Sequence, residues 1–127
     1  MKWVVLALVL LILATGAYVR LAPSDPQRWH ADPLGAPPSG PNWTTLRPGV
    51  DPGPPVWAGT PDALMARLDA IIRATPRTRL MAGSVDARFA TYVVRSRLWG
   101  FPDYVSVRVL PAGEGATLAV WSRARFG

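Results

Sequence analysis

The chain has 127 residues, 14 Lys and Arg against 8 Asp and Glu, and a formal net charge of +6. This length is typical of a single domain. Cysteine is absent, which excludes disulfides, thiolate nucleophiles and cysteine metal sites. Lys2 is the only lysine, so the basic residues are almost all arginines, whose planar guanidinium suits bidentate binding of carboxylate or phosphate.

Residues 3–19 form an unbroken apolar run without a charge. Its Val, Leu and Ile residues favour insertion into a bilayer by about 3 to 6 kcal/mol. Trp3 and Tyr18 lie at its two ends, where aromatic rings favour the membrane interface. We therefore expect residues 1–22 to be a single-pass transmembrane anchor. Lys2 is the only charge before the run, which predicts a cytoplasmic N-terminus and a domain on the extracytoplasmic (periplasmic) side.

A cleaved signal peptide is the alternative interpretation of the same run. Ala14, Thr15 and Gly16 offer small residues at the spacing of a cleavage site. The apolar run continues beyond them to Val19, which favours an uncleaved anchor. Both interpretations place the rest of the chain at a membrane or across it.

Prolines dominate the next segment: residues 23–61 contain 11 of the 14 prolines. Proline lacks a backbone donor and fixes φ, so this stretch predicts neither helix nor central strand. We expect residues 23–55 to be a semi-rigid linker that lifts a domain, residues 56–127, off the bilayer. The segment also holds three tryptophans, Trp29, Trp43 and Trp57. Their expected role is to pin the linker onto the domain by burying aromatic area.

One amphipathic helix is predicted after the linker. Thr60 suits an N-cap, Pro61 the first helical position and Asp62 the first turn. Apolar residues then recur at helical spacing along one stripe, which contains Leu64, Leu68, Ile71 and Ile72. Met65 widens the stripe, and Pro76 marks the end of the helix.

Beyond the helix the apolar period changes to two, which is typical of strands. Four strands are predicted, near Thr78–Ala82, Arg88–Leu98, Val105–Leu110 and Ala116–Arg125. The turns between them are short, so the strands are expected to pair as an antiparallel meander. The predicted fold class is α+β, with an N-terminal transmembrane helix, a Pro-rich linker, and one amphipathic helix packed on a four-stranded antiparallel meander.

The two faces of the predicted sheet differ in polarity. The apolar face, expected to pack on the helix, contains Tyr92, Val94, Leu98, Val105, Val107, Val109, Leu118, Val120, Ala124 and Phe126. The basic face carries Arg95, Arg97, Ser106, Arg108, Trp121, Arg123 and Arg125. The register that best matches the apolar faces sets Val94 opposite Val109, and hence Arg95 opposite Arg108. Like charges directly opposite one another destabilise a sheet, so a negative partner is expected there.

The basic face is therefore the predicted anion-binding surface, and its candidate residues are Arg95, Arg97, Arg108, Arg123 and Arg125. The expected partner, besides the bilayer itself, is an acidic lipid, an anionic polymer or another anionic ligand. The alternative is a solvated face whose long side chains splay apart. Nucleic acid suits the charge but not the predicted location, so it is not expected as a partner.

Catalytic chemistry is not expected. His30 is the only histidine and lies in the linker, so neither a metal site nor a Ser-His-Asp triad has its members together. One carboxylate pair is conceivable, Asp103 with Asp86 or Glu114. All three lie in predicted turns, where carboxylates are usually structural or solvated. We predict no catalytic residue, no metal and no cofactor.

One stretch reads Arg95-Ser96-Arg97-Leu98-Trp99-Gly100-Phe101-Pro102-Asp103-Tyr104-Val105; later come Val107-Arg108-Val109 and Ser122-Arg123-Ala124-Arg125-Phe126-Gly127. These motifs resemble the bacterial domain-of-unknown-function family 1499, over about residues 41–127. The resemblance implies a small α+β domain behind a membrane segment and a Pro-rich linker, without an established activity. Two departures stand out. Trp43 occupies a position where the family often has Cys, and members usually continue past the final motif, which implies a truncated or a shortened member.

Together these features predict an uncharacterised, membrane-anchored cell-envelope protein that is not a catalyst. Its basic sheet face would contact an anionic lipid, polymer or ligand. The first alternative is a structural or assembly module that docks on another membrane protein through its exposed sheet face, aided by Trp99 and Trp121. An enzyme with an Asp103-centred site is the least favoured interpretation.

Overall fold

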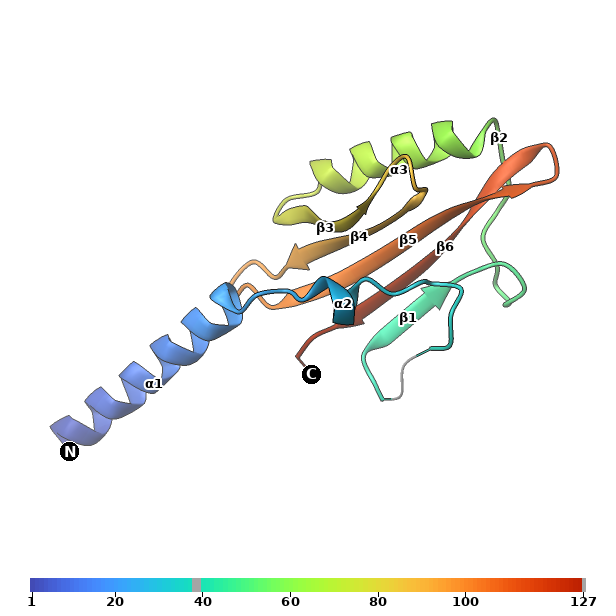
Figure 1. Cartoon of the computed structure of the whole chain (residues 1–127). Coiled ribbons are helices and arrows are strands. Elements are labelled where there is room, and N and C mark those ends of the chain that lie inside the picture. Colours follow the sequence, from blue (N-terminus) through green and yellow to red (C-terminus); the bar gives the residue numbers. More distant parts are fainter. Residues whose placement is uncertain (38–39, 127) are drawn as a thin grey trace.

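The computed structural model describes residues 1–37 and 40–126. Its elements are α1 (Lys2–Leu21), α2 (Pro26–Trp29), β1 (Trp43–Leu46), β2 (Trp57–Ala58), α3 (Pro61–Ala74), β3 (Thr78–Ser84), β4 (Phe89–Arg95), β5 (Pro102–Ala112) and β6 (Gly115–Ala124). The long helix α1 projects away from a domain in which α3 lies along one face of an antiparallel sheet (Figure 1). The predicted α+β class is confirmed.

Helix α3 begins where the capping residues predict. The Thr60 hydroxyl accepts a hydrogen bond from the backbone N–H of Ala63 at 3.1 Å, and Pro61 occupies the first turn. Met65, expected only to widen the apolar stripe, is the one fully buried residue of the helix and lies in the core. Ile71, expected in that stripe, is 57% exposed. The face that packs on the sheet is therefore rotated toward Met65.

The sheet has two more strands than the predicted four. The order is β1-β6-β5-β4-β3, with β2 also paired to β6. Strands β3 to β6 form the predicted antiparallel meander. Strand β1 adds an edge and comes from the segment predicted to be linker. Its four residues, Trp43–Leu46, contain no proline, so every backbone N–H is free to join the ladder. Because the surrounding segment is rich in proline, the sequence pattern predicted linker where this short strand forms.

The register between β4 and β5 differs from the prediction. Arg95 pairs with Pro102, and Arg108 pairs with Phe89, so the expected apposition of Arg95 and Arg108 is wrong. The hairpin turns earlier than predicted, because Ser96 and Phe101 close the loop with N–H···O hydrogen bonds of 3.0 Å and 2.9 Å. Pro102, which opens β5, lies six residues before Arg108. Since this offset is even, the residues of each strand keep the face predicted for them.

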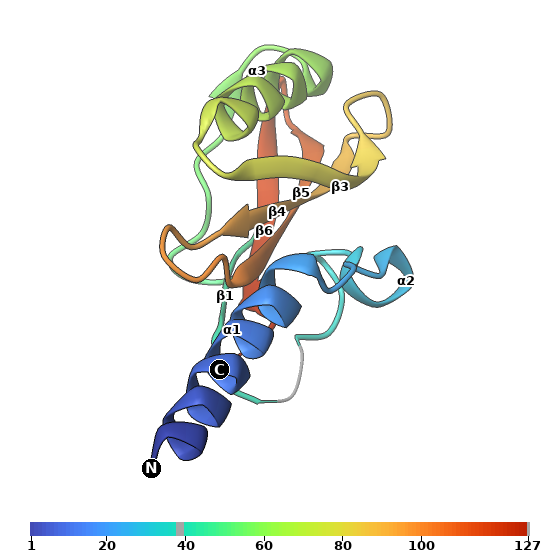
Figure 2. The same cartoon turned by 90° about the vertical axis from the view of Figure 1, so that its left-hand side faces the viewer.

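The face of the sheet opposite α3 is not open to solvent. Residues 22–35, here called the strap, lie across it and include the single turn of α2 (Figures 1 and 2). Trp29 stacks on Tyr104 with ring centroids 4.3 Å apart, and His30 stacks on Phe89 at 4.0 Å. The first part of the predicted linker thus covers the sheet, and Trp29 attaches it to the domain by aromatic packing, as expected. A sheet with apolar side chains on both faces needs a second layer, and the strap supplies it.

Candidate functional site

Four of the five arginines predicted to bind an anion share the strap face, and most of them bind the strap itself. Arg108 forms an ion pair with Asp32, with Nη2 and Oδ2 2.8 Å apart. Arg125 donates to the carbonyl oxygen of Pro23 at 2.9 Å. Arg123 donates to the carbonyl oxygen of Trp29. The predicted open basic surface is therefore corrected: in this fold these three guanidiniums hold the chain's own N-terminal segment.

Arg123 lies at the centre of this attachment. It is only 6% exposed, and its guanidinium lies 4.5 Å from the ring centroid of Trp121. Burial lowers the pKa of Arg123 below its usual value. Trp121, expected to aid docking from an exposed face, is 8% exposed and lies beneath the strap. This tryptophan is not accessible to a partner while the strap is in place.

A chain of polar side chains joins His30 of the strap to Arg123. The imidazole Nδ1 lies 2.8 Å from the Thr91 hydroxyl, which lies 2.7 Å from the Ser106 hydroxyl. Ser106 in turn accepts a hydrogen bond from Arg123 at 3.2 Å. Burial lowers the pKa of His30 below its ordinary value of 6.5, and the neighbouring positive charges of Arg123 and Arg108 lower it further. The surroundings of His30 in the folded protein therefore favour the neutral form of its imidazole.

Lowering the pH from 8 to 5 is expected to destabilise the fold through His30. In the unfolded chain this group takes up a proton near pH 6.5, whereas the folded chain takes it up only at lower pH. Between these values the unfolded state binds more protons, so stability falls as the pH falls. His30 is the only histidine. Thermal melting of the wild type and of His30→Asn, which retains a hydrogen-bonding side chain, measures the effect.

The asparagine variant is expected to lose most of the difference in melting temperature between pH 8 and pH 5. An identical difference in both proteins would show that His30 is not the group that titrates.

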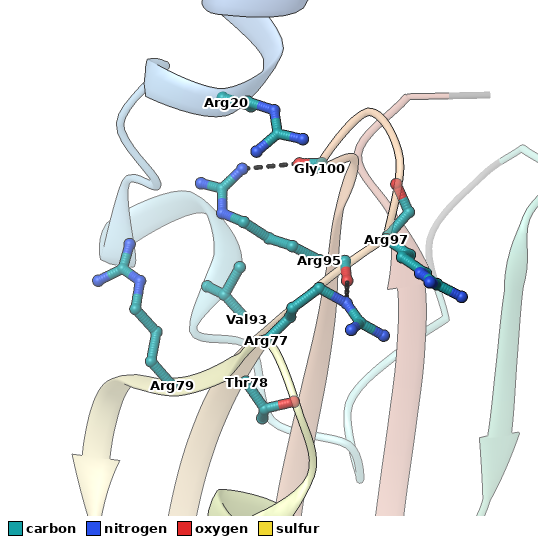
Figure 3. Close-up of a pocket in the computed structure, with 9 residues that line it drawn as sticks. Arg20, Arg77, Thr78, Arg79, Val93, Arg95, Arg97 and Gly100 are labelled. Atoms are coloured by element: carbon teal, nitrogen blue, oxygen red, sulfur yellow. Dashed lines mark hydrogen bonds between the residues drawn. The ribbon is translucent and has the colours of Figure 1, made fainter.

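A second group of arginines lines a cavity where the sheet meets the end of α1. This arginine cavity has a volume of about 370 Å³ and is lined by Arg20, Arg77, Thr78, Arg79, Val93, Arg95, Ser96, Arg97 and Gly100. Figure 3 shows the guanidiniums of Arg20 and Arg95 beside the Gly100 carbonyl, with Arg79 reaching toward them from β3. Arg77 and Arg97 point away from these three (Figure 3). Arg97, predicted on the sheet face, lies instead in the β4–β5 loop.

Hydrogen bonds to backbone carbonyls fix two of these guanidiniums. Arg95 donates to Val19 O at 3.1 Å and to Gly100 O at 2.9 Å, and Arg20 donates to Leu98 O at 2.6 Å. Gly100 has φ +72°, and a Cβ there would lie 2.9 Å from Cγ of Arg20. A glycine at this position therefore allows the arginine of α1 to cross the loop closely.

The cavity carries positive charge without an acidic partner. No Asp or Glu is among the described residues that line it. The ion pairs of the described chain use other arginines, namely Arg73, Arg88 and Arg108. Burial lowers the pKa of Arg95, and the positive charges of Arg79, Arg125 and Arg20 lower it further. An anion placed between these guanidiniums would relieve the repulsion.

Sequence reasoning identified Arg95 and Arg97 for an anion site but missed Arg20, Arg77 and Arg79. For Arg79, the sequence did contain a pattern that predicts its place beside Arg95. It pairs with Val93 in the β3–β4 ladder, so its side chain lies on the same face as Arg95. The period-two pattern of β3 carried this information. Arg20 was interpreted only as the flank of the apolar helix, and its contact with a loop 78 residues away depends on the tertiary fold.

Asp103 does not lie near Asp86 or Glu114, the two carboxylates considered as its catalytic partners. It lies in β5, not in a turn, and partial burial raises its pKa. A shallow cavity beside it is lined by residues that include Asn42, Trp43 and Ser122. Asp86 and Glu114 lie in the turns at the other end of the sheet. No group of three or more His, Asp or Glu side chains in the described residues is placed to hold a metal.

The chain was also compared with known proteins. A scan against protein families, a search of curated proteins and a search of solved structures each found no match. The resemblance to family 1499 stays a prediction.

Proposed function

We propose that this protein is a single-pass membrane protein whose arginine cavity binds the phosphate of an acidic lipid headgroup. The observation that carries the proposal is the convergence of Arg20, Arg79 and Arg95 at the end of α1 without a carboxylate beside them. In this proposal the domain lies on the extracytoplasmic side, as Lys2, the single charge before the apolar run of residues 3–19, favours. The protein would sit on the bilayer and recruit or retain acidic lipid.

The length of α1 supports the membrane anchor. Its 20 residues, at about 1.5 Å each, span about 30 Å, which is the thickness of a bilayer's hydrocarbon core. Its mean hydropathy is 2.4, a value that signal sequences also reach. Contacts of the last turns favour an uncleaved helix. Gly16, the last residue of the predicted cleavage site, lies against the ring of Trp99, so cleavage after it would remove a contact that the folded domain makes.

The position of the cavity supports a lipid as the source of the anion. Arg20 is the penultimate residue of α1, so a spanning helix brings this guanidinium to the level of the headgroups. Guanidinium groups bind phosphate oxygens through two parallel hydrogen bonds, and such charge-assisted bonds are about twice as strong as neutral ones. Free donors remain available, because the side chain of Arg79 makes no hydrogen bond to a described residue and that of Arg95 uses only Nη1.

Replacing Arg79 with glutamine tests the proposal. Its side chain is exposed and makes no hydrogen bond or ion pair with any residue that the structure describes, so the change leaves the fold intact. One basic residue near an anionic lipid surface contributes about 1 kcal/mol, which corresponds to about a fivefold loss of preference for acidic over zwitterionic lipid. Native mass spectrometry of the full chain, equilibrated with equal phosphatidylglycerol and phosphatidylcholine, counts the lipids that remain bound.

Arg67→Gln is the matched control, since Arg67 is also exposed but lies on α3, away from the cavity. This control is expected to keep the wild-type preference, and raised salt is expected to weaken it in both proteins. Equal retention of the two lipids by the wild type, or the same loss in Arg67→Gln and Arg79→Gln, would eliminate the arginine cavity as a lipid site.

A further inference from the structure

We infer that the β4–β5 loop, Ser96–Phe101, is a second membrane element that inserts Leu98 and Trp99 into the interfacial layer of the bilayer. This inference shares with the proposed function the spanning of the membrane by α1. It is independent of which anion, if any, the arginine cavity binds.

The loop exposes large apolar side chains next to one another. Leu98 is 75% exposed, Trp99 44% and Phe101 40%. A tight hairpin loop of a water-soluble domain is usually polar, and exposed apolar residues that adjoin one another mark contact surfaces. The exposed apolar residues of this loop lie at the end of the domain from which α1 departs (Figure 1).

Contacts with α1 determine how deep the loop lies in the bilayer when α1 spans it. The ring of Trp99 lies against Gly16, and a Cβ at that glycine would be 3.5 Å from the ring. Gly16 precedes Arg20 by about one helical turn, so Trp99 lies about 6 Å deeper along the helix axis than Arg20 does. A residue at this depth is at or below the headgroups when α1 spans the bilayer. Tryptophan is also the side chain most enriched at that level.

Backbone polar groups of the loop form hydrogen bonds within the protein, as an environment without water requires. The carbonyl oxygens of Leu98 and Gly100 accept hydrogen bonds from Arg20 and Arg95. The N–H of Phe101 donates to the Ser96 hydroxyl, and its carbonyl oxygen accepts from the Ser96 N–H. In lipid, irregular backbone is tolerated only when its polar groups are paired within the protein. Five of the backbone polar groups of this loop meet that condition, while its apolar side chains are exposed.

More aromatic residues gather at the same level. Phe126 lies between α1 and the loop, with its ring centroid 6.3 Å from that of Tyr18 and 6.2 Å from that of Phe101. Together with Trp99 these rings form a group around the outer end of α1, which is the arrangement of an interfacial aromatic belt. The partner that fits this surface is the glycerol and upper acyl region of a phospholipid bilayer.

The absence of cysteine makes a direct test simple, because one introduced cysteine gives one labelled site. The full chain carrying Leu98→Cys is labelled with an environment-sensitive fluorophore and placed in nanodiscs of phosphatidylcholine alone. Glu114→Cys, in the turn at the opposite end of the sheet, is the matched control. Some of the phosphatidylcholine carries a nitroxide, either on the headgroup or high on the acyl chain, and quenches the fluorophore according to its depth.

The label at position 98 is expected to show a blue-shifted emission and strong quenching by the acyl-chain nitroxide, whereas the label at position 114 shows neither. Emission and quenching at position 98 that match those at position 114 would overturn the inference. Quenching only by the headgroup nitroxide would also overturn it, since the loop would then rest on the surface without entering. Because these discs contain no acidic lipid, failure of the arginine cavity to bind phosphate leaves the result unchanged.

Discussion

Replacing Arg123 with alanine is expected to release the strap from the sheet. The guanidinium donates to the Trp29 carbonyl, to the Ser106 hydroxyl at 3.2 Å and to the Trp121 carbonyl at 3.4 Å. Hydrogen bonds from charged groups contribute about 1.5 to 3 kcal/mol each when buried, and the truncation also removes the packing between two tryptophan rings. We expect a loss of about 3 kcal/mol in the free energy that holds the strap.

Limited proteolysis measures this loss, because trypsin cleaves after Arg28 and this residue lies within the strap. A change of about 3 kcal/mol corresponds to cleavage about 100-fold faster when opening precedes cutting. Arg123→Met keeps much of the side-chain volume without the donors, so it separates hydrogen bonding from packing. Arg67→Ala, on α3, is the control and is expected to leave the rate unchanged. An unchanged rate in Arg123→Ala would show that the aromatic stacking and the contacts of Arg108 and Arg125 hold the strap without Arg123.

Truncation of Met65 to alanine is expected to destabilise the domain by about 3 kcal/mol, within the range of 2 to 5 kcal/mol typical of large-to-small changes in a core. Met65 is fully buried in a cluster with Tyr92, Val107 and Leu118. One helix covers this face of the sheet, so few neighbours are able to move into the space that the side chain leaves. Urea denaturation of the full chain in nanodiscs gives the change in the free energy of unfolding.

Ile71→Ala on the same helix is the control. This side chain is 57% exposed, and its truncation is expected to change stability by less than about 0.5 kcal/mol. Similar losses in Met65→Ala and Ile71→Ala would mean that the helix packs through the stripe predicted from the sequence, and not through the face that the structure shows.

Local patterns predicted most of the fold. The hydroxyl of Thr60 and the ring of Pro61 define a helix start through chemistry confined to one turn, and the structure confirms it. Alternating apolar residues predicted the four strands of the meander and their inward faces, with two exceptions. Leu98 lies in the exposed loop, and Phe126 lies beyond the end of β6, beside Tyr18 of α1. Periodicity does not fix where a hairpin turns, and the Ser96–Phe101 closure shifted the register by an even number of residues.

The candidate site depended on contacts that no local pattern contains. Four of the five arginines of the basic face lie on the side of the sheet predicted for them, and three of these four bind the chain's own strap. The negative partner that was expected to be a ligand is supplied by Asp32 and by the carbonyl oxygens of Pro23 and Trp29. The arginine cavity assembles residues from α1, β3 and β4. The β3–β4 ladder places Arg79 near Arg95, and the docking of α1 on the β4–β5 loop adds Arg20.

The attachment of α1 to the domain has a mechanical consequence. Arg20, Arg95 and Trp99 tie the helix to the β4–β5 hairpin, so the two turn together and not about a loose hinge. Strand β5 begins at this joint and runs for 11 residues, or about 36 Å, toward the far tip of the sheet. Helices lean to different degrees in bilayers of different thickness, and a change of about 10° in that lean would sweep the tip sideways by about 6 Å. With α1 spanning the bilayer as proposed, the position of the outermost turn would change with the thickness of the membrane.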